Sequence, residues 1–420
     1  MTMVRRQTSD ENVTTPPSPS IDEGLARAAT RFFPDATSVE PAAGRAHLVR
    51  VETPSGTWAV RRWPVGTPQE RVDFVHEVLR ESRAAGIDFV PDVTVAASDG
   101  STVLALDGRL YDAESWLPGR APLRGPDLLD ERGRGINRPS PLSAATLMSA
   151  VRAIATWHGS TESLAARENV PQAPLDAALR AVRASWEEQR QRLRPLAPRT
   201  THIQRWIRTG EVVLAAATEA LAGADFLRSR PTVVGHLNLW PAHLLVSRFE
   251  GQERITGMLD FAESAASSPL IDLAQLISHF NGWTGAAAED AIGAYADVRT
   301  LAPEERRLLP AVAGLDLIAE TGRLLTLGYA TRAIVESGGG DTIRAGAASL
   351  LLSLEAIAPA VQRGDRPEPS KARKWEYGPR RSGPAARRRP GSPAGPKPSR
   401  SSSGRSERRD TPVKPGRDNR

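Results

Sequence analysis

The chain has 420 residues, of which 40% are hydrophobic and 25% are charged, a balance typical of soluble globular proteins with a full-size core. The absence of cysteine excludes disulfides, thiolate metal sites, cysteine nucleophiles and iron–sulfur clusters. The net charge of +6 is unevenly distributed, because residues 361–420 alone hold 18 Lys/Arg and 6 Asp/Glu. That net charge of +12 leaves −6 on the remaining residues, whose composition therefore gives no support for nucleic-acid binding.

Both ends of the chain have the composition of segments that do not fold. Residues 1–20 are rich in Ser, Thr and Pro, and residues 364–420 are rich in Pro, Gly, Ser and Arg. Such segments bury too little apolar surface to offset the entropy of folding. We therefore predict disordered tails at residues 1–24 and 363–420, an N-terminal domain at residues 25–122 and a helical domain at residues 123–362.

The sequence shows neither an apolar secretory signal nor a clear membrane-spanning segment. The first residues are polar, and no run of about 18 uncharged apolar residues occurs. The nearest candidate, residues 345–361, contains Glu355 and is interpreted as a buried helix. We therefore expect a cytoplasmic protein that does not enter a membrane.

Residues 25–122 have the pattern of a small α+β unit. Runs rich in β-formers alternate with turn residues such as Pro54-Ser55-Gly56, and one amphipathic segment ends at Gly86. The predicted order is two strands, one helix and three strands, at residues 47–52, 57–63, 69–85, 92–97, 102–106 and 109–116.

After Pro122 the hydrophobic periodicity becomes helical, with one β-rich interruption. The predicted helices lie at residues 143–158, 176–194, 203–222, 270–280, 286–296, 303–320, 321–335 and 342–362, and Gly159 is expected to end the first. The interruption predicts strands at residues 232–235, 244–249 and 255–261. Short strands inside a helical domain commonly hold functional loops in place, so this segment is the candidate site.

Three short motifs follow one another in and after this interruption. They are His236-Leu237-Asn238 with His243 five residues further on, then Asp260-Phe261-Ala262, then Asp272-Leu273-Ala274. This order resembles the aminoglycoside phosphotransferase family, which are small-molecule kinases with a protein-kinase-like fold. The resemblance runs from about residue 33 to residue 358. It implies an α+β, two-lobed architecture, with a small β-sheet-plus-helix N-lobe and a larger, mostly helical C-lobe.

The resemblance assigns roles to individual residues. His236 matches the family's histidine, Asn238 stands at the catalytic aspartate, and His243 stands at the metal-binding asparagine. Asp260 matches the metal-binding aspartate, and Asp272 matches a structural aspartate at a helix start. The implied catalytic positions are therefore Asn238 and His236, and the implied metal ligands are Asp260 and His243.

The first domain supplies the expected nucleotide site. Residues 58–61, Trp-Ala-Val-Arg, resemble the kinase strand that carries a phosphate-binding lysine, with Arg61 at the lysine and small Ala59 on the same face. Arginine keeps the charge and offers a fork of donors to phosphates, although a solvated strand arginine is the alternative. Residues 114–119 resemble the hinge at which adenine binds, so Glu114 and Trp116 are the expected nucleotide contacts.

The sequence departs from the family at three positions that carry chemistry. The helix glutamate that pairs with the lysine should fall near Val75, and Glu77 is the nearest substitute. Asn238 cannot act as a base, because an amide does not gain a proton near neutral pH. A positioned base contributes roughly 10²–10⁴ in rate, so Asn238 predicts a crippled enzyme or a different base. The imidazole of His243 suits Mn²⁺ better than Mg²⁺, and a hydrogen-bonded structural imidazole is its alternative interpretation.

Three hypotheses for function follow. By resemblance, the protein uses ATP with Mg²⁺ or Mn²⁺ to phosphorylate a hydroxyl of a small molecule that the sequence does not identify. The second is a pseudokinase that binds a nucleotide or a partner without turnover, which Asn238 favours. The third is a nucleic-acid-associated protein that acts through Arg387-Arg388-Arg389 and the rest of the basic tail, for which a merely solubilising tail is the alternative.

Overall fold

The structure is a computed structural model that describes residues 21–42, 45–96, 100–122, 143–222, 233–280, 282–284, 286–331 and 340–363. All of these residues belong to one compact unit, Met1–Ser370. The two predicted tails, apart from residues 21–24 and Arg363, lie outside the described residues.

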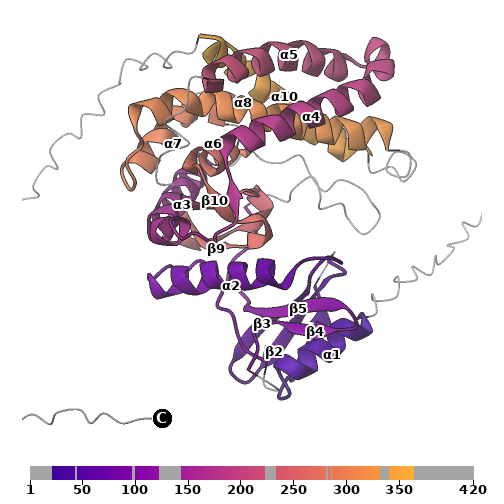
Figure 1. Ribbon diagram of the computed structural model, residues 1–420, viewed down its shortest axis with the longest axis vertical. Helices are drawn as coiled ribbons and strands as arrows, with labels where there is room; N and C mark the ends of the chain where they lie inside the picture. The colour runs from indigo at the N-terminus through magenta and orange to yellow at the C-terminus, as the bar shows by residue number, and fades with distance from the viewer. Residues whose placement is uncertain are drawn as a thin grey trace, which may run out of the picture. The chain divides into compact units, whose positions relative to one another are not determined.

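The N-lobe is a five-stranded antiparallel sheet with two helices (Figure 1). The strand order is β1-β2-β3-β5-β4. The elements are α1 (Glu23–Phe32), β1 (Ser38–Pro41), β2 (Leu48–Thr53), β3 (Gly56–Arg62), α2 (Gln69–Ala84), β4 (Leu104–Leu106) and β5 (Arg109–Ser115).

The alternation of residues along these strands gives the sheet two different faces. Apolar residues such as Val51 and Val60 pack with Leu25 and Phe32 of α1 and form a small core of their own. The alternate positions of β3 and β5 carry polar side chains, and Arg61 lies directly opposite a carboxylate on β5. One face therefore holds the sheet together, and the other is available for chemistry.

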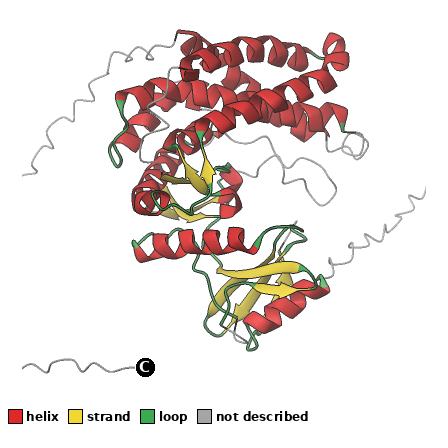
Figure 2. Cartoon of the chain, in the orientation of Figure 1, coloured by secondary structure: helices red, strands yellow, loops and turns green. Residues whose placement is uncertain are grey.

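The C-lobe is mostly helical and contains two small sheets, coloured yellow in Figure 2. Its strands form a three-stranded sheet in the order β6-β10-β7 and a two-stranded hairpin of β8 and β9. The α-helices are α3 (Ala144–Ala165), α4 (Leu175–Leu193), α5 (Thr201–Ala222), α6 (Pro269–His279), α7 (Ala287–Ala296), α8 (Pro303–Leu325) and α10 (Gly340–Arg363). The strands are β6 (Gln172–Ala173), β7 (Val233–Gly235), β8 (Leu244–Phe249), β9 (Gln252–Met258) and β10 (Ala265–Ser267).

Short helical turns complete the C-lobe and place the loops between its strands. In the part of the C-lobe that the structure describes, 3-10 turns lie at Arg194–Arg199, Pro241–His243, Phe261–Glu263 and Gly282–Thr284, and a π turn lies at Thr326–Ala330. The turn at Pro241–His243 ends the loop that begins after β7, and the turn at Phe261–Glu263 directly follows Asp260.

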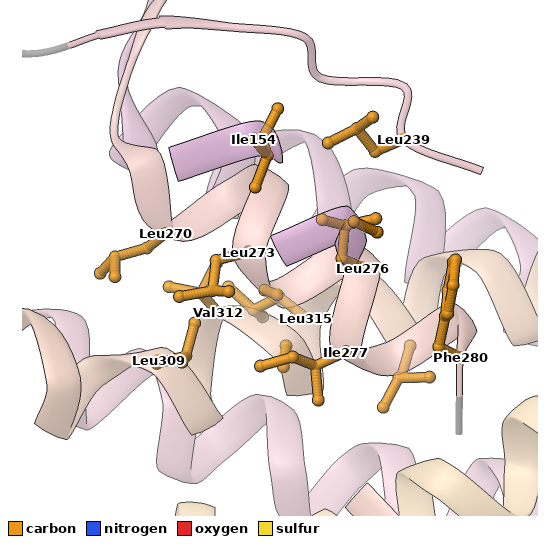
Figure 3. Close-up of a cluster of buried hydrophobic side chains, with 14 of the residues drawn as sticks. Ile154, Leu239, Leu270, Leu273, Leu276, Ile277, Phe280, Leu309, Val312 and Leu315 are labelled. Atoms are coloured by element: carbon orange, nitrogen blue, oxygen red, sulfur yellow. The ribbon is translucent and has the colours of Figure 1, made fainter. Parts of the chain in front are cut away.

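The main core joins the candidate loop to the helices. Leu270, Leu273, Leu276 and Ile277 of α6 pack with Leu309, Val312 and Leu315 of α8 (Figure 3). Leu239, which lies between β7 and β8 in the candidate loop, belongs to the same fully buried cluster. The buried side chain of Leu239 thus anchors the loop in the core.

Several predicted elements differ from those observed. Helix α3 continues past Gly159 to Ala165, because the buried side chains of Thr161 and Leu164 extend its packing face. The predicted helices at 303–320 and 321–335 are one helix, α8, followed by the π turn. The predicted strand at 92–97 makes only an isolated bridge at Val93, and neither α1 nor β1 was predicted.

Among the described residues, one helix, at Ile343–Arg363, is long and apolar enough to cross a membrane by length and composition. Its residues Ala347, Leu351 and Leu354 are fully buried in the main core, as expected for the buried helix predicted at 345–361. A single helix of this kind is weak evidence, and no membrane protein is indicated.

Candidate functional site

Asp272, near the start of α6, holds the backbone of His236 and Leu237 in the loop after β7, and we call this part of the loop its underside. Its carboxylate accepts hydrogen bonds from the backbone N–H groups of His236 at 2.6 Å and Leu237 at 2.8 Å. It also accepts one from Nε2 of His158 at 3.0 Å. Leu237 has a φ of 63°, a strained value for a non-glycine residue that persists only where surrounding contacts enforce it. Asp272 therefore has the structural role that the resemblance implied.

His236 lies within this support and uses both ring nitrogens there. Its Nε2 donates to the carbonyl of Leu259 at 2.9 Å, and its Nδ1 accepts from the N–H of Asn238 at 3.3 Å. Burial lowers the pKa of His236 to about 4, so the ring is neutral at physiological pH. These contacts fix the loop and leave neither nitrogen of His236 for a substrate.

Asn238, His243 and Asp260 meet on the other side of the loop, although 22 residues separate Asn238 from Asp260. Nδ2 of Asn238 donates to Oδ2 of Asp260 at 3.2 Å. Nδ1 of His243 donates to the carbonyl of Asn238 at 2.6 Å, and its Nε2 lies 3.4 Å from the same Asp260 oxygen. The structure thus brings together three of the four residues predicted from the C-lobe motifs.

The donor set at Asp260 fits a cation that is bound mainly by other ligands. Among the residues that the structure describes, no three His, Cys, Asp or Glu side chains converge as a complete metal site. Mg²⁺ is commonly held by one or two carboxylates together with substrate phosphates, and Asp260 supplies one carboxylate. The nitrogen of His243 beside it is a better ligand for Mn²⁺.

The turn after Asp260 is clamped from the N-lobe. Asp260 itself has φ 67° and ψ 61°, the left-handed region. Arg71 on α2 donates from Nε to the carbonyl of Ala262 at 2.8 Å and from Nη1 to the carbonyl of Ser264 at 2.6 Å. Its Nη2 also contacts the Ala262 carbonyl. Arg71 therefore ties the conformation of the Asp260 turn to helix α2.

Arg61 is engaged by two carboxylates of β5. Its Nε and Nη2 donate to Asp112 at 3.2 and 2.7 Å, and Nη2 also donates to Glu114 at 2.7 Å. Only 15% of the Arg61 side chain is exposed, which rules out the solvated alternative. Burial raises the pKa of Glu114. For Asp112, burial is outweighed by the Arg61 charge and by hydrogen bonds, which hold its pKa well below the usual range.

The structure shows the contacts of the other N-lobe residues that the sequence singled out. Glu114 was expected at the hinge, but its carboxylate is occupied by Arg61. Trp116 follows β5 with 40% exposure, and the guanidinium of Arg50 lies 5.3 Å from its ring. Glu77 does not replace the helix glutamate, because it pairs with Arg167 at the surface. Sequence reasoning missed Asp112, whose only signal is a carboxylate two residues before Glu114 in a strand.

Backbone contacts link the segment after β5 to the C-lobe hairpin. Arg120 exchanges N–H···O bonds with Val246 of β8, at 3.0 and 2.8 Å. The hydroxyl of Thr256 on β9 donates to the carbonyl of Pro118 at 2.8 Å. On the other side, the N–H of Met258 donates to the carbonyl of Phe89 at 2.7 Å. The strand that leads to Asp260 is therefore attached directly to the N-lobe.

Comparisons with known proteins match this chain to one family. The family model described as the phosphotransferase enzyme family (APH) matches residues 38–309, well over half of the chain. The search of curated proteins found no match.

Solved structures show the same fold at low sequence identity. An aminoglycoside phosphotransferase from Alicyclobacillus acidocaldarius aligns with a TM-score of 0.56 and 14% identity over 83% of this chain and 97% of its own. A microcompartment-associated aminopropanol kinase aligns with a TM-score of 0.57 and 17% identity, and the alignment covers 82% of this chain and 100% of the kinase. An amicoumacin kinase in complex with AMP-PNP, Ca²⁺ and Ami aligns with a TM-score of 0.50 and 13% identity, and the alignment covers 78% of this chain and 93% of the kinase.

Proposed function

The chain belongs to the phosphotransferase enzyme family and has its kinase-like fold, and from this premise we propose that it transfers the γ-phosphate of ATP to a hydroxyl of a small molecule. The observation that carries the proposal is the meeting of Asn238, His243 and Asp260 after β7 and β9, at the positions where the family motif places its reactive groups.

The residues of the site would divide the work as follows. Asp260 would hold the divalent cation, with His243 beside it, and Arg61 would offer its remaining guanidinium donors to the phosphates. The cation, when bound, supplies charge neutralisation for the transferring phosphoryl group. Asn238 would orient the acceptor hydroxyl through its amide oxygen, and the hydroxyl proton would pass to an oxygen of the transferred phosphoryl group as the bond to the β-phosphate of ATP breaks. Phosphoryl transfer depends mainly on positioning and electrostatics, so slow turnover is compatible with an amide at this place.

The named ligands of the neighbours support the classes of substrate. The amicoumacin kinase was solved with AMP-PNP and Ca²⁺, which supports a nucleotide and a divalent cation here. The aminopropanol kinase and the aminoglycoside phosphotransferase support a small hydroxyl-bearing acceptor. We place this activity in the cytoplasm, and association with nucleic acid through the basic tail at residues 363–420 stays a prediction from composition.

A pseudokinase is the second candidate, and a specific contact favours it. The Asn238 amide cannot accept a proton, and its Nδ2 donates to Oδ2 of Asp260, where it competes with a cation for that oxygen. A protein of this kind would bind a nucleotide and turn it over no faster than the spontaneous reaction.

The melting temperature, measured at increasing ATP concentration, distinguishes both of these functions from a function that involves no nucleotide. We expect ATP with Mn²⁺ or Mg²⁺ to raise the melting temperature, and Asp260→Asn to remove most of the metal-dependent part. The exposed carboxylate Asp290, changed to Asn, is the matched control and should leave the shift intact. Phosphate release above background then supports the enzyme, and its absence supports the pseudokinase. A wild type that is not stabilised by any metal–nucleotide pair would overturn both.

A further inference from the structure

Helix α2 lacks the glutamate that pairs with the strand cation in this family, yet it still reaches Arg61 by another route. His76 is fully buried on α2, next to Val75, and its Nε2 donates to Oδ2 of Asp112 at 3.1 Å. The same Asp112 oxygen accepts from Nη2 of Arg61 at 2.7 Å. The contacts therefore run from helix to strand β5 and from β5 to strand β3.

We propose that His76 and Asp112 are positioning residues that together replace the missing helix glutamate and hold Arg61 in the orientation that binds nucleotide phosphate. The proposal rests on the proposed nucleotide site. A direct ion pair between helix and strand is thus replaced by a relay of three residues: His76 on α2, Asp112 on β5 and Arg61 on β3.

The geometry of Asp112 suits this role. Both of its oxygens are used, because Oδ1 accepts from Nε of Arg61 at 3.2 Å while Oδ2 accepts from Arg61 and His76. Two parallel N–H···O bonds fix the plane of a guanidinium as well as its position. The edge of Arg61 that carries Nη1 has no contact with either carboxylate and is the edge left for a phosphate.

The buried state of the relay explains why a third member is needed. Asp112 and His76 are both fully buried, where an ionised carboxylate is costly unless all of its lone pairs find donors. The His76 tautomer with its proton on Nε2 supplies that donor. Nδ1 of His76 has no hydrogen-bond partner among the described residues, which is tolerable for a lone pair and costly for a buried N–H.

The glutamates nearby do not serve this function. Glu114 contacts only the Nη2 atom that Asp112 already holds, so it adds charge without fixing the guanidinium plane. Glu77, the next residue on α2, is 41% exposed and pairs with Arg167. Glu77→Gln is therefore a matched control on the same helix.

Four single variants of the full chain, together with the Asp112→Asn/His76→Leu double variant, test the relay: Asp112→Asn, His76→Leu, His76→Gln and the control Glu77→Gln. The first measurement is urea unfolding without nucleotide of the wild type, of the Asp112→Asn and His76→Leu single variants, and of the double variant. We expect the double variant to lose less stability than the two single losses added, as for residues in direct contact. Additive losses would overturn the contact between helix and strand.

The second measurement is the dissociation constant for ATP with Mn²⁺, taken at a temperature where each variant is folded. His76→Leu should weaken binding by about tenfold, the scale seen when a group that orients a ligand is removed. His76→Gln keeps a donor and should stay within about twofold of the wild type, as should Glu77→Gln. Equal weakening by His76→Leu and His76→Gln would reduce His76 to a packing role and overturn the proposal.

The two measurements keep this inference apart from the proposed function. If the wild type binds no nucleotide while the unfolding losses remain coupled, the relay exists and the proposed function fails. If the wild type binds nucleotide and His76→Leu binds it equally well, the proposed function stands and the relay fails.

Discussion

The loop after β7 has two sides that differ in how fully their polar groups are satisfied. On the underside, Asp272 is fully buried and accepts three hydrogen bonds, two from the loop backbone and one from His158. At Asp260, which is partly exposed, Asn238 and His243 both approach a single carboxylate oxygen. The buried side of the loop is therefore fully paired and the Asp260 side is not, which separates the residues that hold the fold from those proposed to act on a ligand.

The largest expected effect is on the underside. Asp272→Ala would leave three buried donors unpaired, and we expect it to lower the free energy of unfolding by about 3–5 kcal/mol. Urea unfolding measures this loss directly. A loss below about 1 kcal/mol would show that the loop is held by other contacts, and the contrast between the two sides would disappear.

A smaller effect is expected where the N-lobe supports the Asp260 side. Arg71→Met removes the donors to the carbonyls of Ala262 and Ser264, which should cost about 2 kcal/mol in unfolding free energy. Because the Asp260 turn then loses its clamp, metal-dependent stabilisation by ATP should weaken more than metal-free binding. A variant that loses stability but keeps the wild-type metal dependence would show that Arg71 supports only the fold.

The smallest effect is a pH dependence of stability that arises from the underside. Burial lowers the pKa of His158, so the unfolded chain takes up a proton near pH 6.5 while the folded chain does not. Stability should therefore fall as the pH drops below about 6.5, by at most about 1.4 kcal/mol per pH unit for this proton.

Unfolding of the wild type and of His158→Gln between pH 7 and pH 5 measures this slope. The variant should show a shallower fall, because glutamine does not titrate. Burial also raises the pKa of Tyr295, whose hydroxyl donates to Nδ1 of His158, so stability should fall again above about pH 10. Identical slopes in the wild type and His158→Gln would assign the acid sensitivity to other groups.

The sequence predicted much of this molecule because its signals are local. Helical periodicity located α2, α5 and α6 to within a few residues, and the motif spacing brought Asn238, His243 and Asp260 to one place. The fold class and the family were confirmed by the structure and the family match. These features depend on short stretches of chain or on a spacing that the family shares.

The features that were missed depend on register and packing. The partners of Arg61 follow from the pairing of β3 with β5, in which Arg61 lies opposite Asp112, and no local pattern encodes that register. The pairing of the Glu114 carboxylate with Arg61 was likewise not predicted. Gly159 was expected to end α3, but packing of the following turn overrides its low helix propensity.

The central claim is the proposal that Asn238 stands where the family's proton acceptor would lie, in contact with Asp260 and His243. The most direct test is the rate of ATP hydrolysis by Asn238→Asp compared with the wild type, each at saturating ATP with Mn²⁺ or Mg²⁺. We predict a rise of roughly 10²–10⁴, which Asp260→Asn in the same background should abolish. An Asn238→Asp protein that binds ATP as the wild type does, yet turns it over no faster, would contradict the account.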